Sequence, residues 1–99
     1  MRLSDDVIRG LKRVALEEAG ARARLRLFGS RLDDTRRGGD VDLLLEVPDA
    51  VERPAVLAAR VSARASRLMH GRKVDVVLLA PNLRKLPIHE IALRQGVAL

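Results

Sequence analysis

Residues 40–47, DVDLLLEV, join two carboxylates to an almost wholly apolar run. Leu43, Leu44 and Leu45 are consecutive, so in an extended strand their side chains alternate between the two faces. A strand that is apolar on both faces is typical of a sheet covered on both sides. This segment therefore predicts a sheet with helices packed against it, and Pro48 marks the end of the strand.

The rest of the chain alternates helical and extended patterns around this strand. Apolar spacings of three and four residues predict helices between Ser4 and Gly20 and over residues 52–69. Pro87 and Gly96 bound a further short helix, predicted over residues 87–95. Further strands are predicted over residues 23–28, 73–80 and 97–99, and a short helical turn followed by a loop over residues 31–39. We expect one α/β (α+β) domain over residues 1–99, a small mixed β-sheet with helices packed on it.

Length and composition exclude several classes of protein. The 99 residues suit one domain, and no apolar run approaches the roughly 20 residues that span a bilayer. Asp5 and Asp6 stand where a signal peptide would be apolar. Cysteine is absent, which excludes disulfides, thiol nucleophiles and zinc–thiolate sites. We therefore expect a cytoplasmic protein with no membrane partner.

The net charge of +6 permits attraction to phosphates without establishing a nucleic-acid partner. The chain has no Trp and no Tyr, and its single Phe28 lies in an apolar run. The aromatic platform on which single-stranded bases stack is therefore missing. Compositional bias toward Arg in an Ala-, Arg- and Leu-rich chain is the simpler explanation of the positive net charge. Nucleic acid is therefore a disfavoured partner.

Three carboxylates carry the strongest chemical signal. Asp40 and Asp42 are two residues apart in a strand, so both side chains project from one face. Like charges this close raise each other's proton affinity, and a divalent cation such as Mg²⁺ removes the conflict. Asp75 lies in the apolar strand 73–79, where a charge is costly unless it is paired or metal-bound. If the two strands are neighbours, the carboxylates predict a two-metal phosphoryl-transfer site.

Gly29 and Ser30 interrupt the strand 23–28 sharply. A strand that ends in Gly-Ser and enters a helix presents backbone N–H groups and a hydroxyl, which form an anion cradle. Each motif also has a simpler interpretation: a surface strand for Asp-x-Asp, a plain turn for Gly-Ser, and an edge charge that opposes aggregation for Asp75. The order and spacing of the motifs favour the phosphate site.

Gly29-Ser30 followed by Gly39-Asp40-Val41-Asp42-Leu43 resembles the signature of the DNA polymerase β-like nucleotidyltransferase superfamily. The brevity of the chain and the segments 73–77, KVDVV, and 91–97, IALRQGV, look like its minimal nucleotidyltransferase (MNT) branch. The resemblance extends over residues 23–99. It implies the polymerase β-like nucleotidyltransferase fold.

The resemblance also implies roles for individual residues. Asp40, Asp42 and Asp75 would be catalytic ligands of two Mg²⁺ ions, and Asp75 would stand near the acceptor hydroxyl and help remove its proton. Gly29 and Ser30 would hold the β- and γ-phosphates of a nucleoside triphosphate. We include Arg31 and Arg37 among the nucleotide-binding candidates.

The chain departs from the family pattern at two places. Gly39 stands where many members have Ser, which costs a hydroxyl but no ligand. After Gly-Ser, residues 32–34 read Leu-Asp-Asp where Ala-Arg-Gly is frequent. Arg36 and Arg37 are candidates to supply the positive charge instead, with a solvated loop as the alternative. His70 and His89 receive no functional role.

The expected function follows from the MNT resemblance. Members often act with a small helical HEPN protein, and some transfer AMP from ATP to a Tyr of this partner, acting as antitoxins. We therefore expect an Mg²⁺-dependent protein adenylyltransferase antitoxin. One alternative is an antitoxin that neutralises its partner by contact with little or no catalysis. A small-molecule adenylyltransferase of the aminoglycoside type is a further alternative, and a homo-oligomer is left open.

The expected protein partner needs a docking surface. Arg60, Arg64 and Arg67 recur at spacings of four and three residues, so they fall on one side of the helix over residues 52–69. Arginine suits protein interfaces because its guanidinium pairs with carboxylates in two-pronged fashion. This arginine face is the candidate surface, and a solvated helix face is the alternative.

Overall fold

The computed structural model describes residues 3–29 and 41–99. The turn expected over residues 31–39 therefore lies outside the described residues, as do Ser30, Arg31, Arg37 and Asp40. The described elements are, in chain order, α1 (Asp5–Ala19), β1 (Arg24–Phe28), β2 (Val41–Glu46), α2 (Pro54–Leu68), β3 (Val74–Leu79), α3 (Pro87–Gln95) and β4 (Val97–Ala98).

The four described strands form one mixed sheet in the order β3-β2-β1-β4. β1 pairs antiparallel with both β2 and β4, whereas β2 and β3 are parallel. Parallel neighbours need a crossover connection, and α2 supplies it. The expected mixed sheet and the last edge strand are thus confirmed.

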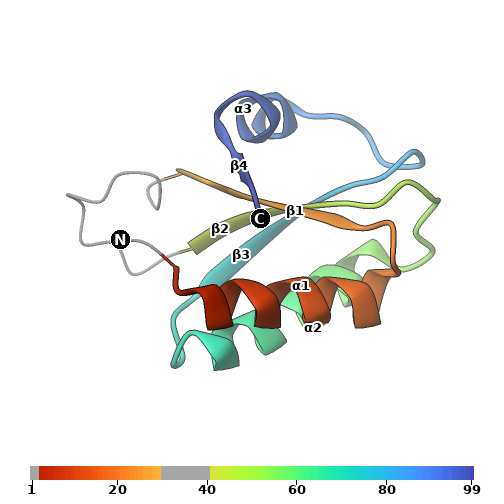
Figure 1. Ribbon diagram of the computed structural model, residues 1–99. Coiled ribbons are helices and arrows are strands. Elements are labelled where there is room, and N and C mark those ends of the chain that lie inside the picture. Colours follow the sequence, from red (N-terminus) through yellow and green to blue (C-terminus); the bar gives the residue numbers. More distant parts are fainter. Residues whose placement is uncertain (1–2, 30–40) are drawn as a thin grey trace.

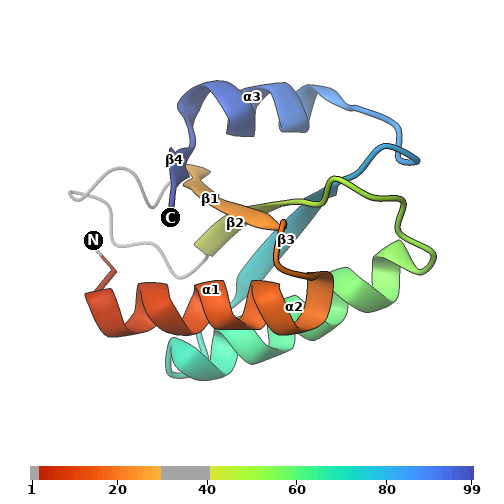
Figure 2. The same ribbon diagram turned by 45° about the vertical axis from the view of Figure 1, so that its right-hand side comes forward.

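The sheet is covered on both faces, as the apolar run in β2 predicts. α1 and α2 lie side by side against one face, and α3 lies across the other (Figures 1 and 2). Leu43, Leu44 and Leu45 each have 0% exposure, although neighbouring side chains point in opposite directions. The two helical layers therefore bury the centre of β2 completely.

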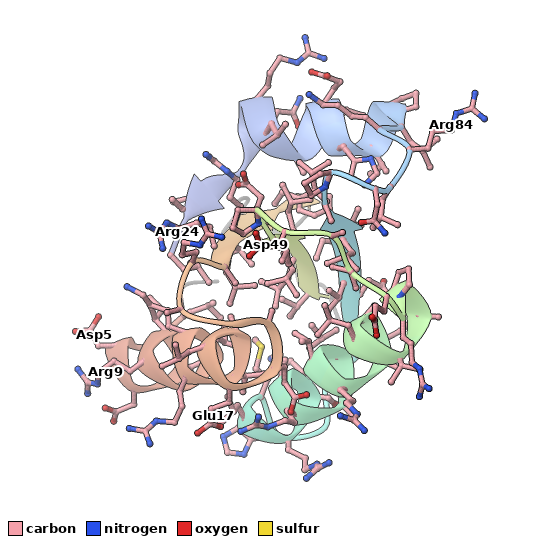
Figure 3. All side chains as sticks on the ribbon, turned by 90° about the vertical axis from the view of Figure 1, so that its right-hand side faces the viewer. Asp5, Arg9, Glu17, Arg24, Asp49 and Arg84 are labelled. Carbon is pink, nitrogen blue, oxygen red and sulfur yellow. The ribbon has the colours of Figure 1, made fainter. Side chains whose placement is uncertain are left out.

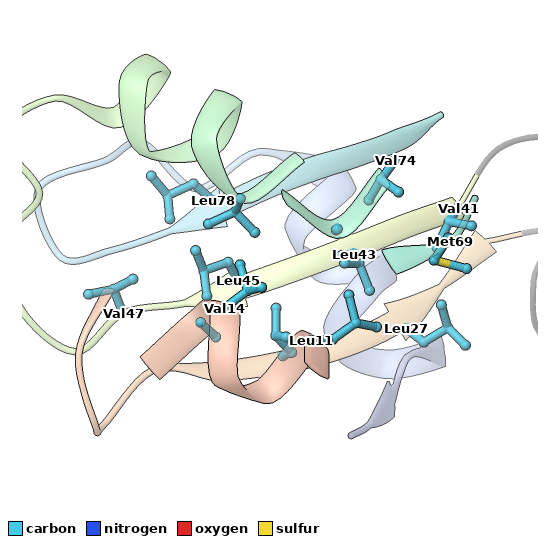
Figure 4. Close-up of a cluster of buried hydrophobic side chains, with 14 of the residues drawn as sticks. Leu11, Val14, Leu27, Val41, Leu43, Leu45, Val47, Met69, Val74 and Leu78 are labelled. Carbon is cyan, nitrogen blue, oxygen red and sulfur yellow. The ribbon is translucent and has the colours of Figure 1, made fainter. Parts of the chain in front are cut away.

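The larger core lies between the sheet and the α1–α2 layer (Figure 4). Alternate residues of β2, namely Val41, Leu43 and Leu45, contribute to it together with Val74 and Leu78 of β3. The helices contribute mainly Leu11, Val14, Val61 and Ala65. The intervening strand positions face α3, where Phe28, Leu44 and Ala92 form a smaller core.

The helices follow their sequence signals with small shifts in their bounds. The Ser4 hydroxyl accepts a hydrogen bond from the Val7 N–H at 3.2 Å, so it caps α1 as expected. α2 begins at Pro54, not residue 52, because proline suits the first turn, where its missing N–H costs nothing. None of the helices among the described residues is long and apolar enough to cross a membrane.

His89 is a structural residue, consistent with the absence of a predicted role. Its buried ring accepts a hydrogen bond from the Leu86 N–H at Nδ1 (2.8 Å), so the proton resides on Nε2, which donates to the Leu78 carbonyl (2.9 Å). The Ser62 hydroxyl of α2 donates to the Val74 carbonyl of the same strand. Helices on opposite faces thus occupy two carbonyls of β3, which is an edge strand of the sheet.

The arginine face of α2 is partly used inside the molecule. Arg64 forms ion pairs with Glu17 and Glu18 of α1. The Nη1 atom of Arg60 lies 3.9 Å from Oε1 of Glu18. The hydrogen bond from Arg64 lowers the pKa of Glu17, whose position at the α1–α2 contact appears in Figure 3. Spacing along one helix could not reveal these acidic neighbours on α1, and the role of the arginine face as a docking surface stays a prediction.

Candidate active site

Asp42 and Asp75 are neighbours across the parallel pair of strands. Asp42 is the second residue of β2, Asp75 is the second residue of β3, and their Cα atoms are partners in the register. The sequence predicts this juxtaposition only if the two strands are adjacent, and the observed register confirms it. Asp40, the third predicted carboxylate, lies outside the described residues.

Both carboxylates project from the face of the sheet that α3 covers. Strand side chains alternate, so Asp42 shares a face with Leu44, and Asp75 shares one with Val77. Leu44 and Val77 belong to the core beneath α3. Phe28, another member of this core, is the register partner of Asp42 on β1. The carboxylates therefore border an apolar floor, and the Asp75 side chain stays 46% exposed.

Gly29 leaves room for the Asp42 carboxylate. The residue follows β1 directly and has a φ of 76°, a backbone conformation that costs side-chain-bearing residues energy. A Cβ atom built on Gly29 would overlap Asp42 Oδ2 and lie 3.1 Å from its Cγ. Glycine is therefore required here both by the backbone and by the close approach of the carboxylate.

Lys73 adds a positive charge to the same face. Its Nζ lies 3.9 Å from Asp75 Oδ1, and its side chain is 70% exposed. The Lys73 carbonyl accepts a hydrogen bond from the Val41 N–H at 2.9 Å, which ties this backbone to the start of β2. Sequence reasoning missed this residue, although the two-residue spacing from Asp75 was a usable signal.

The two described carboxylates are suitable ligands for a hard divalent cation, but two side chains alone do not form a full coordination site. Within residues 3–29 and 41–99, no three His, Cys, Asp or Glu side chains come together to hold a metal. Asp42 and Asp75 supply carboxylate oxygens from adjacent strands, the ligand type that Mg²⁺ takes together with waters and phosphates. The roles predicted for Asp40, Ser30, Arg31 and Arg37 stay predictions.

The chain matches the family model described as nucleotidyltransferase domain over residues 8–97. This match covers nearly the whole chain, so the protein belongs to the nucleotidyltransferase domain family. The three helices and mixed four-stranded sheet of the described residues agree with the polymerase β-like nucleotidyltransferase fold, and the match is consistent with the MNT branch. The family supports nucleotidyl transfer as the general activity. No curated protein matches this chain.

Proposed function

We propose that the chain transfers AMP from ATP to a hydroxyl of a partner protein of the HEPN type, acting as an antitoxin. The observation that carries the chemical part is the pairing of Asp42 with Asp75 on one face of the sheet. Members of the nucleotidyltransferase family generally use a nucleoside triphosphate and Mg²⁺. The protein acceptor and the choice of ATP rest on the MNT resemblance.

The chain's own residues have distinct tasks in this proposal. Asp42 and Asp75, with Asp40, hold Mg²⁺, which supplies positive charge against the triphosphate. Gly29 and Ser30 bind the β- and γ-phosphates, with Arg31 and Arg37 as further phosphate ligands. Asp75 receives the proton of the acceptor hydroxyl as its oxygen attacks the α-phosphorus, and pyrophosphate leaves. In-line positioning of the hydroxyl supplies much of the remaining rate enhancement.

The outer face of α3 favours a protein as the acceptor. Leu86 at the N-cap of α3 and Ile88 and Ile91 within the helix are exposed by 46%, 39% and 39%, and exposed apolar side chains that lie together are typical of an interaction surface. Arg84 and Arg94 flank them, and Arg94 also attracts Glu90 of the same helix electrostatically. Arg84 projects away from the body of the molecule (Figure 3). A helical partner with an apolar, acidic surface complements this face.

The test is incubation of the chain with α-labelled ATP, Mg²⁺ and a candidate HEPN protein. We expect label on the partner, and a loss of about a thousandfold in rate for Asp75→Asn because charge stabilisation by the metal is removed. Capture of an unlabelled partner by the wild type would instead favour neutralisation by contact. Labelling of an aminoglycoside without a partner would favour the small-molecule alternative.

A further inference from the structure

Outside the carboxylate pair, the described residues form a cationic groove beside α1 and an apolar face on α3. The groove between α1, β1 and Leu99 has a volume of about 720 Å³ and is rimmed by Arg9, Lys12, Arg13 and Arg24. Nothing in it selects one anionic ligand over another, because arginine is abundant over the whole surface. Lys73 has a specific neighbour and a specific chemistry.

We propose that Lys73 is a phosphate-binding residue of the candidate active site. This inference rests on the proposed function, because it assigns a ligand for the nucleotide at the same carboxylates. The Lys73 ammonium lies beside Asp75, with 3.9 Å between Nζ and Oδ1. When nucleotide and cation bind, the ammonium moves from Asp75 to a phosphate oxygen.

The position of Lys73 makes this exchange physically reasonable. Its backbone is held against β2 by the hydrogen bond from Val41, so the side chain starts from a defined point next to Asp42 and Asp75. Its four-carbon stem is flexible, and at 70% exposure the ammonium has open solvent in which to move. Lysine binds phosphate as a point charge and needs no fixed two-pronged geometry.

Electrostatics predicts that Lys73 has opposite effects on the affinity for the metal alone and on the affinity for the metal–nucleotide complex. A divalent cation at Asp75 is repelled by an ammonium a few ångströms away, so Lys73 weakens binding of the metal alone. A triphosphate brings several negative charges, so the same ammonium strengthens binding of the metal–nucleotide complex. A simple surface ion pair would contribute little to either equilibrium.

The variants for the test are Lys73→Met, Lys73→Arg and a matched control, Lys85→Met. Lys85 also pairs with a carboxylate, Glu90 at 3.0 Å, and is 50% exposed. It lies in the segment between β3 and α3, beyond the end of β3 that is opposite to Asp75. Both methionine variants therefore lose one charge and one exposed ion pair, but only one does so beside Asp75.

The measurements are the affinity for Mn²⁺ alone and the affinity for a non-hydrolysable ATP analogue and for tripolyphosphate, each with Mg²⁺. We expect Lys73→Met to bind Mn²⁺ about threefold more tightly, since like-charge repulsion is removed. It should bind the analogue and tripolyphosphate about tenfold more weakly, since a charge-assisted hydrogen bond is lost. Lys73→Arg should retain most of the phosphate affinity, and Lys85→Met should behave as the wild type.

Two results overturn the inference in different ways. If the wild type binds Mn²⁺ and the analogue, Asp75→Asn abolishes Mn²⁺ binding, and Lys73→Met changes neither affinity, Lys73 is only a surface ion-pair partner and the proposed function stands. If the wild type binds neither Mn²⁺ nor the analogue, the inference and the proposed function both fail. Thermal unfolding of each variant shows whether it is folded.

Discussion

The two faces of the sheet are built from the same strands, yet they differ in what they bury. Of the described residues, fifteen buried hydrophobic side chains form the core on the α1–α2 face, and three form the core beneath α3. The carboxylates of Asp42 and Asp75 project from the α3 face. Alternation along a strand thus lets one face provide stability while the other carries polar groups.

This difference explains how the sheet tolerates two adjacent carboxylates. Each acid is the second residue of its strand, before the fully buried centre is reached, and the α3 layer over it is a single short helix. The Asp75 carboxylate therefore keeps contact with water, while its neighbours Val74 and Val76 help to pack the other face. The full cost of burying a charge is therefore avoided, while the strands that carry the carboxylates stay packed on the other face.

The largest expected effect on the free energy of unfolding comes from truncating a buried leucine on each face of the sheet. Leu43→Ala should reduce the free energy of unfolding by about 4 kcal/mol and Leu44→Ala by about 2 kcal/mol, although both residues are fully buried. The cavity left by Leu43 lies under two packed helices, whereas the single helix over Leu44 can settle into the space. Urea unfolding measures both. A larger loss for Leu44→Ala would contradict the difference between the faces.

A smaller effect is expected where β1 meets the carboxylates. Gly29→Ala should cost about 2 kcal/mol of stability, and Gly71→Ala about 1 kcal/mol. Both glycines have positive φ, but a Cβ on Gly71 meets nothing within 4 Å, whereas one on Gly29 overlaps the Asp42 carboxylate. Gly29→Ala should also weaken Mn²⁺ binding, and Gly71→Ala should not. Equal effects of the two variants on Mn²⁺ affinity would show that Gly29 serves the turn alone.

The smallest expected effect concerns the decrease in the free energy of unfolding at acidic pH. The hydrogen bond from Arg64 lowers the pKa of Glu17 below its ordinary value of 4.5, so this pair stabilises the fold above that pH. The stabilisation is lost as the pH falls through the lowered pKa, because protonated Glu17 no longer pairs with Arg64. Glu17→Gln should therefore flatten the decline of stability below about pH 4.5, as measured by urea unfolding across pH.

Glu90 of α3 provides a control for the effect of Glu17 on stability at acidic pH. Lys85 lowers the pKa of Glu90, but the two residues are only five positions apart and part of their attraction survives in the unfolded chain. Glu17 and Arg64 belong to different helices and separate on unfolding. Glu90→Gln should therefore change stability at acidic pH less than Glu17→Gln, and the reverse order would contradict the assignment of Glu17 as an interhelical link.

Local sequence patterns predicted the elements well, because each signal is contained in a few neighbouring residues. The consecutive leucines of β2 indicated coverage on both faces, and apolar spacing indicated α2. Features that depend on distant segments were less accessible. The pairing of Asp42 with Asp75 needed the register between β2 and β3, and the strand order placed β1 between β2 and β4. The ion pairs of Arg64 could not be predicted from its own helix, because its partners Glu17 and Glu18 lie on another one.

The central claim is that the carboxylates on the α3 face bind a divalent cation. Calorimetric titration of Mn²⁺ into the wild type, Asp42→Asn, Asp75→Asn and Asp49→Asn tests it directly. Asp49 is an exposed carboxylate that forms an ion pair with Arg22. Its variant therefore removes one negative charge at a site other than Asp42 and Asp75. We predict that affinity falls by about tenfold or more in Asp42→Asn and Asp75→Asn and is unchanged in Asp49→Asn. Equal Mn²⁺ affinity in all four proteins would contradict the claim.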